Sequence, residues 1–399
     1  MIMMFSAMLS LLLALAVIGG CQAKTSVGLD AARDRNLLAA DLYNAIGADR
    51  LNENIVIGTA VIQTSMALAF YGAKGQTAIE LKEGMRLGIG DGDQVSQRFG
   101  SFQQSLTRDN NLRLANNIYI NENLEFKGAF RDVAQRQFDS NIEKLDFHPP
   151  YNKRTADGIN RAIATKTNNQ IQDILKPELL NDRTDGVMVN GVTYSAPWQK
   201  AFKLDKTEKR SFRTSSGQSV QVDTMWTLNH FNYAEVRSLD AKVLELPYQN
   251  SEFSMLVLLP NRKDGLRALQ QSLVGKNLLS ELSEMSMHKV EVELPKFSVT
   301  FGVSLEQPFK QLGVTTMFSR AGDFGNMYRM FVSHFINAVE HKAHVEVSEA
   351  GVEQPLESGL LKGLFSRNKK FEADHPFAFA IKNRDSIVFM GHVANYAYV

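Results

Sequence analysis

The segments FEADHPF (Phe371–Phe377) and IVFMGHV (Ile387–Val393) stand near the end of the chain, separated by a short and partly polar stretch. Apolar residues flank the turn-forming triplet Asn383–Asp385 on both sides. This pattern is typical of two antiparallel strands joined by a tight connection. We therefore predict a hairpin of Phe377–Ile381 and Ile387–Val393 at the end of the chain.

Strand-like stretches dominate the chain from Val187 onward. They are Val187–Tyr194, Ser219–Met225, Val243–Leu246, Phe253–Leu259 and Val290–Thr300, and one more, Leu112–Ile120, lies in the first half. Phe253–Leu259 is so apolar that we expect it at the centre of a sheet, with both faces buried.

Helical patterns dominate the first half. The predicted helices cover Ala31–Ile46, Ala60–Tyr71, Gln76–Arg86 and Ala156–Leu175. Ala60–Tyr71 is apolar almost all round and is expected to be buried. Helices followed by strands, with no repeat and no linker rich in Pro, Gly or Ser, predict one α+β unit.

The composition excludes several classes of protein. The 399 residues are 44% hydrophobic and 22% charged, which is typical of a globular protein and not of a disordered one. Lys+Arg number 44 and Asp+Glu 43, so the net charge of +1 gives no global attraction to nucleic acid or to anionic membranes. The single cysteine excludes an internal disulfide framework.

The N-terminal stretch differs from the rest. Met1–Gly20 has no charged side chain, Leu11–Ile18 is apolar, and Cys21 and Ala23 form a small-x-small site. We predict a signal peptide over 1–23, followed by a single secreted, monomeric domain over 24–399 that has no membrane segment. A signal anchor and a bacterial lipoprotein box at Ile18–Cys21 are the alternatives.

Motifs for catalysis and for cofactors are weak. His341 and His344 are three apart in a predicted strand, which puts them on opposite faces and disfavours a shared metal. Asp374 and His375 could belong to a hydrolase triad only with a nucleophilic serine, and the sequence has no G-x-S-x-G motif to supply it. The sequence also lacks a phosphate-binding loop of the form GxxxxGK(S/T). The glycine–acid stretch Gly88–Asp93 is expected to be a turn. We predict no enzyme activity, no cofactor and no metal.

The C-terminal segments closely resemble the signature of the serpin family, F-x-A-D-H-P-F followed by F-M-G-R-V, with His392 in place of the arginine. Further motifs match in the same order along the chain. They are Asn54-Ile55, Leu114-Ala115-Asn116, Val189-Asn190 with Trp198, Leu244–Tyr248, Ser254–Pro260, Leu294–Phe297 and His341–Ala343. The resemblance implies three β-sheets, about nine helices and an exposed reactive loop, here about 349–371.

Inhibitory members of this family trap proteases. The protease attacks the loop and forms an acyl-enzyme, and the cut loop then inserts as a strand into the central sheet. The family spacing counts fourteen residues from Gly351 to the residue before the cleaved bond, which implies Phe365–Ser366. Phenylalanine there favours a chymotrypsin-like serine protease as partner, whereas a shifted register with Arg367 would suit a trypsin-like one.

The hinge of the loop departs from the family pattern of small residues. After Glu349 and Gly351 the chain reads VEQPLES (Val352–Ser358). If the glutamates face solvent after insertion, Gln354 enters the core at a cost of about 1–3 kcal/mol unless its amide finds partners. Leu356 overpacks a site for a small residue at a similar cost of about 1–3 kcal/mol. Pro355 cannot donate a hydrogen bond to a neighbouring strand.

A second departure concerns the cluster that the family places where the sheet opens. The two serines of that cluster are replaced by Gly58 and Val61, whereas Asn190 and His341 remain. Lys296, Glu349 and Trp198 remain at positions that the family uses at the top of the sheet.

Two functional hypotheses follow. The first is a secreted serpin that inserts its loop too slowly to trap proteases and acts as a substrate, carrier or binding protein. The second is a working suicide inhibitor of chymotrypsin-like proteases. The degraded hinge is similar to that of several secreted insect serpins, including ones of seminal fluid.

Overall fold

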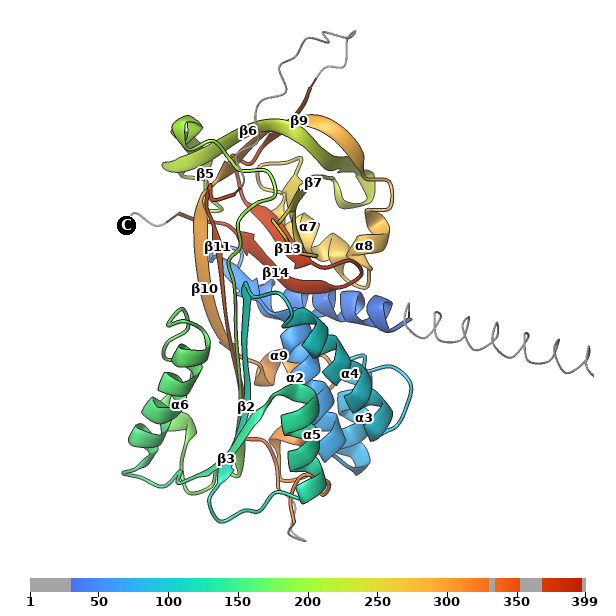
Figure 1. The fold of residues 1–399 in the computed structure, drawn as a ribbon, viewed down its shortest axis with the longest axis vertical. Coiled ribbons are helices and arrows are strands. Elements are labelled where there is room, and N and C mark those ends of the chain that lie inside the picture. The colour runs from blue at the N-terminus through green and yellow to red at the C-terminus, as the bar shows by residue number, and fades with distance from the viewer. Residues whose placement is uncertain (1–29, 330–333, 352–367, 397–399) are drawn as a thin grey trace, which may run out of the picture.

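The computed structural model describes residues 30–329, 334–351 and 368–396. Most of the helices gather at one end of an elongated molecule, and most of the strands gather at the other, together with α7 and α8 (Figure 1). The predicted signal peptide over 1–23, the hinge residues Val352–Ser358 and the predicted bond at Phe365–Ser366 with the alternative Arg367 lie outside the described residues.

Nine α-helices lie within the described residues. The first covers 30–47, and the others are α2 (Thr59–Gly72), α3 (Gly75–Gly84), α4 (Gly92–Leu106), α5 (Gly128–Phe138), α6 (Asn152–Lys166), α7 (Leu266–Leu273), α8 (Leu278–Glu281) and α9 (Glu306–Gln311). Helix α2 is buried along nearly its whole length, as its apolar sequence predicts. Short 3-10 helices cover Pro177–Leu179, Leu204–Lys206, Arg237–Leu239 and Thr316–Phe318.

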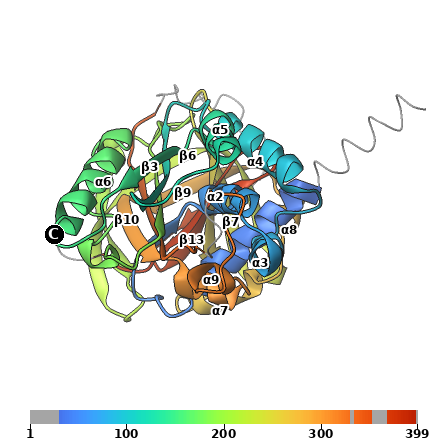
Figure 2. The same ribbon diagram turned by 90° about the horizontal axis from the view of Figure 1, so that it is seen from below.

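The smaller sheet has five strands in the order β10-β11-β4-β2-β3. These are β10 (Phe297–Ser304), β11 (Ala338–Val347), β4 (Gly186–Tyr194), β2 (Leu112–Asn121) and β3 (Asn141–Leu145). Helix α6 covers one face of this sheet and helices α2 to α5 lie on the other side (Figure 1). Figure 2 shows the same arrangement from below, with α6 on one side of the strands and α2 to α5 on the other.

The larger sheet has nine strands, eight of them in the order β1-β14-β13-β8-β7-β6-β9-β12, and β5 pairs with β6. They are β1 (Ile55–Ile57), β5 (Glu208–Arg213), β6 (Ser219–Val236), β7 (Ala241–Pro247), β8 (Ser254–Pro260), β9 (Ser286–Pro295), β12 (Lys369–Glu372), β13 (Phe377–Lys382) and β14 (Ile387–Val393). Strand β6 is 18 residues long and joins what the resemblance counts as two sheets into one hydrogen-bonded sheet.

The predicted hairpin and central strand are confirmed. Strands β13 and β14 pair antiparallel, from Phe377↔Val393 to Lys382↔Ile387. Strand β8 is buried at every residue and lies between β13 and β7. The α+β class is confirmed as well.

Three predicted elements differ clearly in their bounds, and one of them, the strand Ser219–Met225, continues to Val236 as β6. Helix α6 ends at Lys166 instead of Leu175, because Asn168 and Asn169 adopt left-handed backbone angles that stop a helix. The expected strand Val290–Thr300 is two strands of different sheets, β9 and β10, which separate at Pro295 and Lys296.

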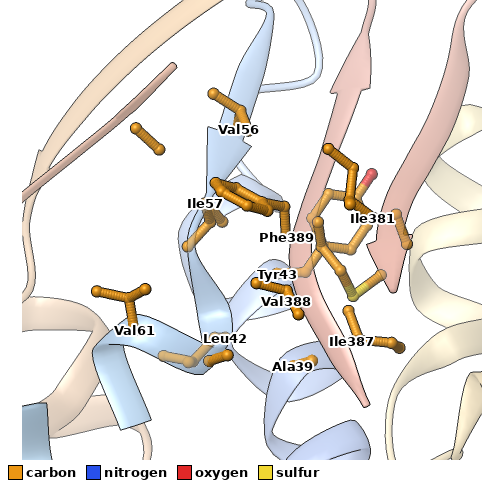
Figure 3. Close-up of a cluster of buried hydrophobic side chains, with 14 of the residues drawn as sticks. Ala39, Leu42, Tyr43, Val56, Ile57, Val61, Ile381, Ile387, Val388 and Phe389 are labelled. Carbon is orange, nitrogen blue, oxygen red and sulfur yellow. The ribbon is translucent and has the colours of Figure 1, made fainter. Parts of the chain in front are cut away.

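A continuous apolar core joins the N-terminal helix to the larger sheet. Figure 3 shows Leu42 of that helix, Ile57 of β1, Val61 on the first turn of α2, and Phe389 of β14 in one buried cluster. Burial of such side chains contributes roughly 1.5–3 kcal/mol each. The cluster fixes the start of α2 beneath the five-stranded sheet.

Candidate functional site

Strands β4 and β11 form a parallel pair at the centre of the five-stranded sheet. Their register runs from Ala338↔Val187 to Val345↔Tyr194 without interruption. Each strand is also paired on its other edge, β11 with β10 and β4 with β2. A strand can enter between β4 and β11 only if this seam opens along its whole length.

Both faces of the seam are covered. Met188 and Val192 belong to the main core beneath the sheet, whereas Val187 and Val189 pack in a second cluster with Ile163 of α6. Side chains of an entering strand would therefore alternate between two packed surfaces. An interior of this kind accepts small residues more readily than large ones.

Trp198 closes the upper end of the seam. Its backbone N–H donates to the carbonyl of Ala350 at 2.8 Å, and its indole N–H donates to the carbonyl of Ser348 at 2.8 Å. The indole is stacked on Tyr248 with ring centroids 4.5 Å apart. Gly351 bridges to Trp198, and a Cβ there would lie 2.6 Å from the Trp198 carbonyl oxygen. The close approach explains why glycine stands at this position.

Glu349 is held beside Trp198 by an ion pair. Its carboxylate lies 2.8 Å from the Lys296 ammonium and accepts a hydrogen bond of 2.8 Å from the Thr207 hydroxyl. Burial alone would raise the pKa of Glu349, but hydrogen bonds from Lys296, its own backbone and Thr207 together lower it below its ordinary value. The structure thus brings Lys296, Glu349 and Trp198 together, and their role in controlling the seam stays a prediction.

A row of polar side chains lies under the middle of the seam. Asn116, Asn190 and His341 are direct cross-strand neighbours on β2, β4 and β11, and all three are buried. Among the described residues neither amide atom of Asn190 has a hydrogen-bond partner, and the amide oxygen of Asn116 has none. Buried polar groups without partners cost free energy, so this row weakens the closed sheet.

Gly58 and Val61 are the positions at which the resemblance implies serines in other members of the family. The backbone N–H of Gly58 donates to Nε2 of His341 at 3.0 Å, so the imidazole is tied to α2 without a serine hydroxyl. A Cβ on Gly58 would lie 2.5 Å from Cγ1 of Val192, which leaves no room for a serine unless the strand shifts. Val61 belongs to the apolar cluster of Figure 3.

His341 makes the fold sensitive to acid. Burial lowers the pKa of its imidazole from 6.5 to about 3. Below about pH 6.5, His341 binds a proton in the unfolded chain but stays neutral in the folded one. The free energy of unfolding therefore decreases as the pH falls toward 3. We expect His341 to cost about 2 kcal/mol of stability at pH 5 relative to pH 7.

The measurement is urea unfolding at pH 7 and pH 5 of the parent and of His341→Gln, which keeps an acceptor for the Gly58 N–H but cannot titrate. The variant should lose about 2 kcal/mol less between the two pH values. His148→Gln, at an exposed histidine, serves as the control and should follow the parent. Parallel losses in His341→Gln and the parent would contradict the assignment.

The other candidate residues do not assemble into a reactive site. His341 and His344 lie on β11 with their side chains on opposite faces, and His344 bonds Thr300 at 2.8 Å. His375 contacts Asp374 at 2.6 Å and the carbonyl of Pro260 at 2.9 Å, which fixes a turn. In the ranges that the structure describes, no cluster of His, Cys, Asp or Glu could hold a metal ion.

Sequence reasoning missed Thr207 and Tyr248, which support Glu349 and Trp198. Thr207 follows a 3-10 turn without hydrophobic periodicity, so no pattern marks it. Tyr248 ends the matched motif Leu244–Tyr248, and this match was the available signal. Among the described helices none is long and apolar enough to cross a bilayer.

Comparison with known proteins adds an independent line of evidence. The family model described as Serpin (serine protease inhibitor) matches residues 33–396. Serine protease inhibitor 42Dd of Drosophila melanogaster is 29% identical over 365 residues, covering 89% of this chain and 95% of that protein.

Solved structures agree with that match. The structure of cleaved Serpin 42Da superposes with a TM-score of 0.84 at 31% identity, covering 93% of this chain and 100% of that one. A structure described as Serpin48, a highly specific serpin in the insect Tenebrio molitor, gives 0.81 at 29% identity, with 92% and 98% covered.

Proposed function

Because this chain belongs to the serpin family, we propose that it is a secreted member that serine proteases cut as a substrate more often than they are trapped by it. Its relatives are protease inhibitors by name, which makes a serine protease the expected partner. The apolar, uncharged stretch Met1–Gly20 supports secretion. After removal of the predicted signal peptide, the mature protein would be a single monomeric domain over 24–399 with no catalytic activity of its own.

The proposal rests on a mismatch between the hinge sequence and the seam. The entering strand would lie between β4 and β11, which are packed on both faces. It would have to bring in Gln354, Pro355 and Leu356. Proline is normally excluded from the middle of a sheet, because it lacks the N–H that a neighbouring strand needs.

Speed decides between trap and substrate. Trapping succeeds only if insertion outruns hydrolysis of the acyl-enzyme. The two side-chain penalties amount to about 4 kcal/mol, from about 1–3 kcal/mol for each. If half of that raises the barrier, insertion slows about thirtyfold, because 1.36 kcal/mol corresponds to a factor of ten. The protease would then be released with its activity intact.

The attacking protease would be chymotrypsin-like. Phe365 precedes the bond that the family spacing selects, and an apolar pocket accepts its ring. Cleavage after Arg367 by a trypsin-like protease is the alternative. Mass spectrometry of the cut chain distinguishes the two bonds.

The test is incubation of the purified protein with chymotrypsin and with trypsin, followed by a denaturing gel and an assay of remaining protease activity. We expect clean cleavage near Phe365 with full chymotrypsin activity. A major SDS-stable band at the summed mass would contradict the proposal. Melting temperatures before and after cleavage then report whether the loop inserts at all, because insertion adds a strand and raises the value.

The second candidate is a working suicide inhibitor, and one observation favours it. The contacts of Trp198, Lys296 and Glu349 at the upper end of the seam are intact. In a protein that no longer inserts its loop, selection would not maintain these contacts. The SDS-stable complex that contradicts the first proposal is the result expected for this one.

A further inference from the structure

A small basic hollow lies beside the nine-stranded sheet, where three loops meet. Its volume is about 240 Å³. Asn52 after the first helix, Arg213 and Ser215 at the β5–β6 turn, and Arg267 at the start of α7 contribute to its lining. Among the described residues, none of those named in the candidate functional site lines this hollow.

The walls of the hollow are anchored by backbone hydrogen bonds. The N–H of Arg213 donates to the carbonyl of Asp374 at 2.8 Å, and the N–H of Ser215 donates to that of Ala394 at 2.9 Å. Gly217 closes the turn with a φ of +84°, a left-handed angle that favours glycine. The hollow is therefore pre-formed, so little conformational entropy would be lost in ordering it when a ligand binds.

The charges in the hollow do not cancel. Lys263 is paired with Asp374 at 2.8 Å, and Asp264 accepts two hydrogen bonds from Arg262, at 3.1 and 3.0 Å. Across the described residues, the side chains of Arg213 and Arg267 form no ion pair within 4.0 Å and no hydrogen bond. Asp264 also lines the hollow, and the charge of Arg213 helps to lower the pKa of that carboxyl, so these two groups are coupled beyond ion-pair distance. The lining nevertheless carries Lys263, Arg213 and Arg267 against the one carboxylate of Asp264, so positive charge remains in excess there.

Neutral donors stand beside these two guanidinium groups. The hydroxyl of Ser215 and the side-chain amide of Asn52 likewise have no hydrogen-bond partner among the described residues. Guanidinium groups present paired N–H donors that match the oxygens of phosphate and sulfate, and such charge-assisted bonds are strong. A volume of 240 Å³ is below the range of drug-sized sites, so a lipid or a steroid does not fit.

We propose that this hollow binds a phosphate or sulfate monoester, with Arg213 and Arg267 holding the oxyanion and Ser215 and Asn52 contacting it or the adjoining group. A sugar phosphate and a sulfated sugar offer the same oxyanion, so both sources are tested. The ligand would tie together the first helix, the β5–β6 turn and α7. Binding to the folded state alone then raises the melting temperature.

The experiment is isothermal titration and thermal unfolding of the full chain at fixed ionic strength with glucose 6-phosphate, glucose 6-sulfate, inorganic phosphate and plain glucose. We expect a Kd on the order of 10⁻⁴ M for at least one monoester, as suits a small ligand with two charged contacts. Plain glucose should not bind. The two monoesters identify the source, and either one supports the site.

Matched variants locate the binding. Arg213→Ala with Arg267→Ala should weaken it at least tenfold, whereas Arg237→Ala with Arg384→Ala removes the same charge from two exposed positions elsewhere and should leave it unchanged. Arg213→Lys with Arg267→Lys keeps the charge but loses the paired donors, so an intermediate loss is expected.

Three outcomes would overturn the proposal. They are no binding of either monoester to the parent, binding of inorganic phosphate without binding of a monoester, and equal losses in the two double-alanine variants. All four arginines are exposed, so the variants should fold, and an unchanged melting temperature without ligand verifies it.

Discussion

Replacing the hinge residues by small ones should turn the protein from a substrate into a trap. In the variant Val352→Thr, Gln354→Ala, Pro355→Ala and Leu356→Ala, no bulky or amide side chain has to enter the core, and the missing N–H is restored. We expect the rate of loop insertion to rise about thirtyfold, corresponding to about 2 kcal/mol of barrier. The measure is the fraction of chymotrypsin recovered as an SDS-stable complex.

The control keeps the hinge and changes the other face of the same segment. Glu353→Ala with Glu357→Ala removes two side chains that would face solvent after insertion. This pair should leave the fraction of complex at the parent level. If both variants give the same increase in SDS-stable complex, the prediction is contradicted. The rate of insertion would then depend on the overall composition of the loop and not on its core-facing residues.

The largest loss of stability is expected from Gly391→Ala. Gly391 lies opposite Val56 of β1 and Phe379 of β13, so β14 is enclosed on both sides. A Cβ at this position would overlap the backbone carbonyl oxygen of Ile55 and lie 2.8 Å from the ring of Phe379. Neither neighbour can move freely, because both belong to paired, buried strands. We expect a loss of about 3 kcal/mol or more, measured by urea unfolding.

Gly128→Ala is the matched control. Gly128 begins α5, and a Cβ there would have no atom within 4 Å. The same chemical change should alter stability by less than about 0.5 kcal/mol in either direction. Similar losses of stability in the two variants would mean that the close approach of neighbouring atoms does not explain why position 391 requires glycine.

Hydrophobic periodicity predicted the elements whose burial is strongest. Helix α2 and strand β8 are covered on all sides, and their runs of apolar residues are unmistakable. Periodicity failed where a polar or irregular feature sets the boundary. Pro295 and Lys296 separate β9 from β10, and the extension of β6 to Val236 carries polar residues such as Asn229 and His230.

The candidate site was predictable only where motifs carried it. Glu349, Lys296 and Trp198 are far apart in the sequence, and only the family resemblance placed them together before the structure did. The unpartnered amide of Asn190 could not be anticipated, because it depends on which atoms of α2 lie beneath β4. Helix α4 went unpredicted, although its capping box at Asp91 and Gln94 was readable from the sequence.

The position of β13 between β8 and β14 bears on how a severed chain would behave. C-terminal to Phe365, the structure describes β12, β13 and β14, their connections and a few flanking residues, and β13 is hydrogen-bonded to β8 along Ala378–Lys382. Peptide-bond scission at the predicted site would leave a C-terminal fragment locked among strands of the larger piece. The nicked molecule would elute from a sizing column as one particle and come apart only in denaturant.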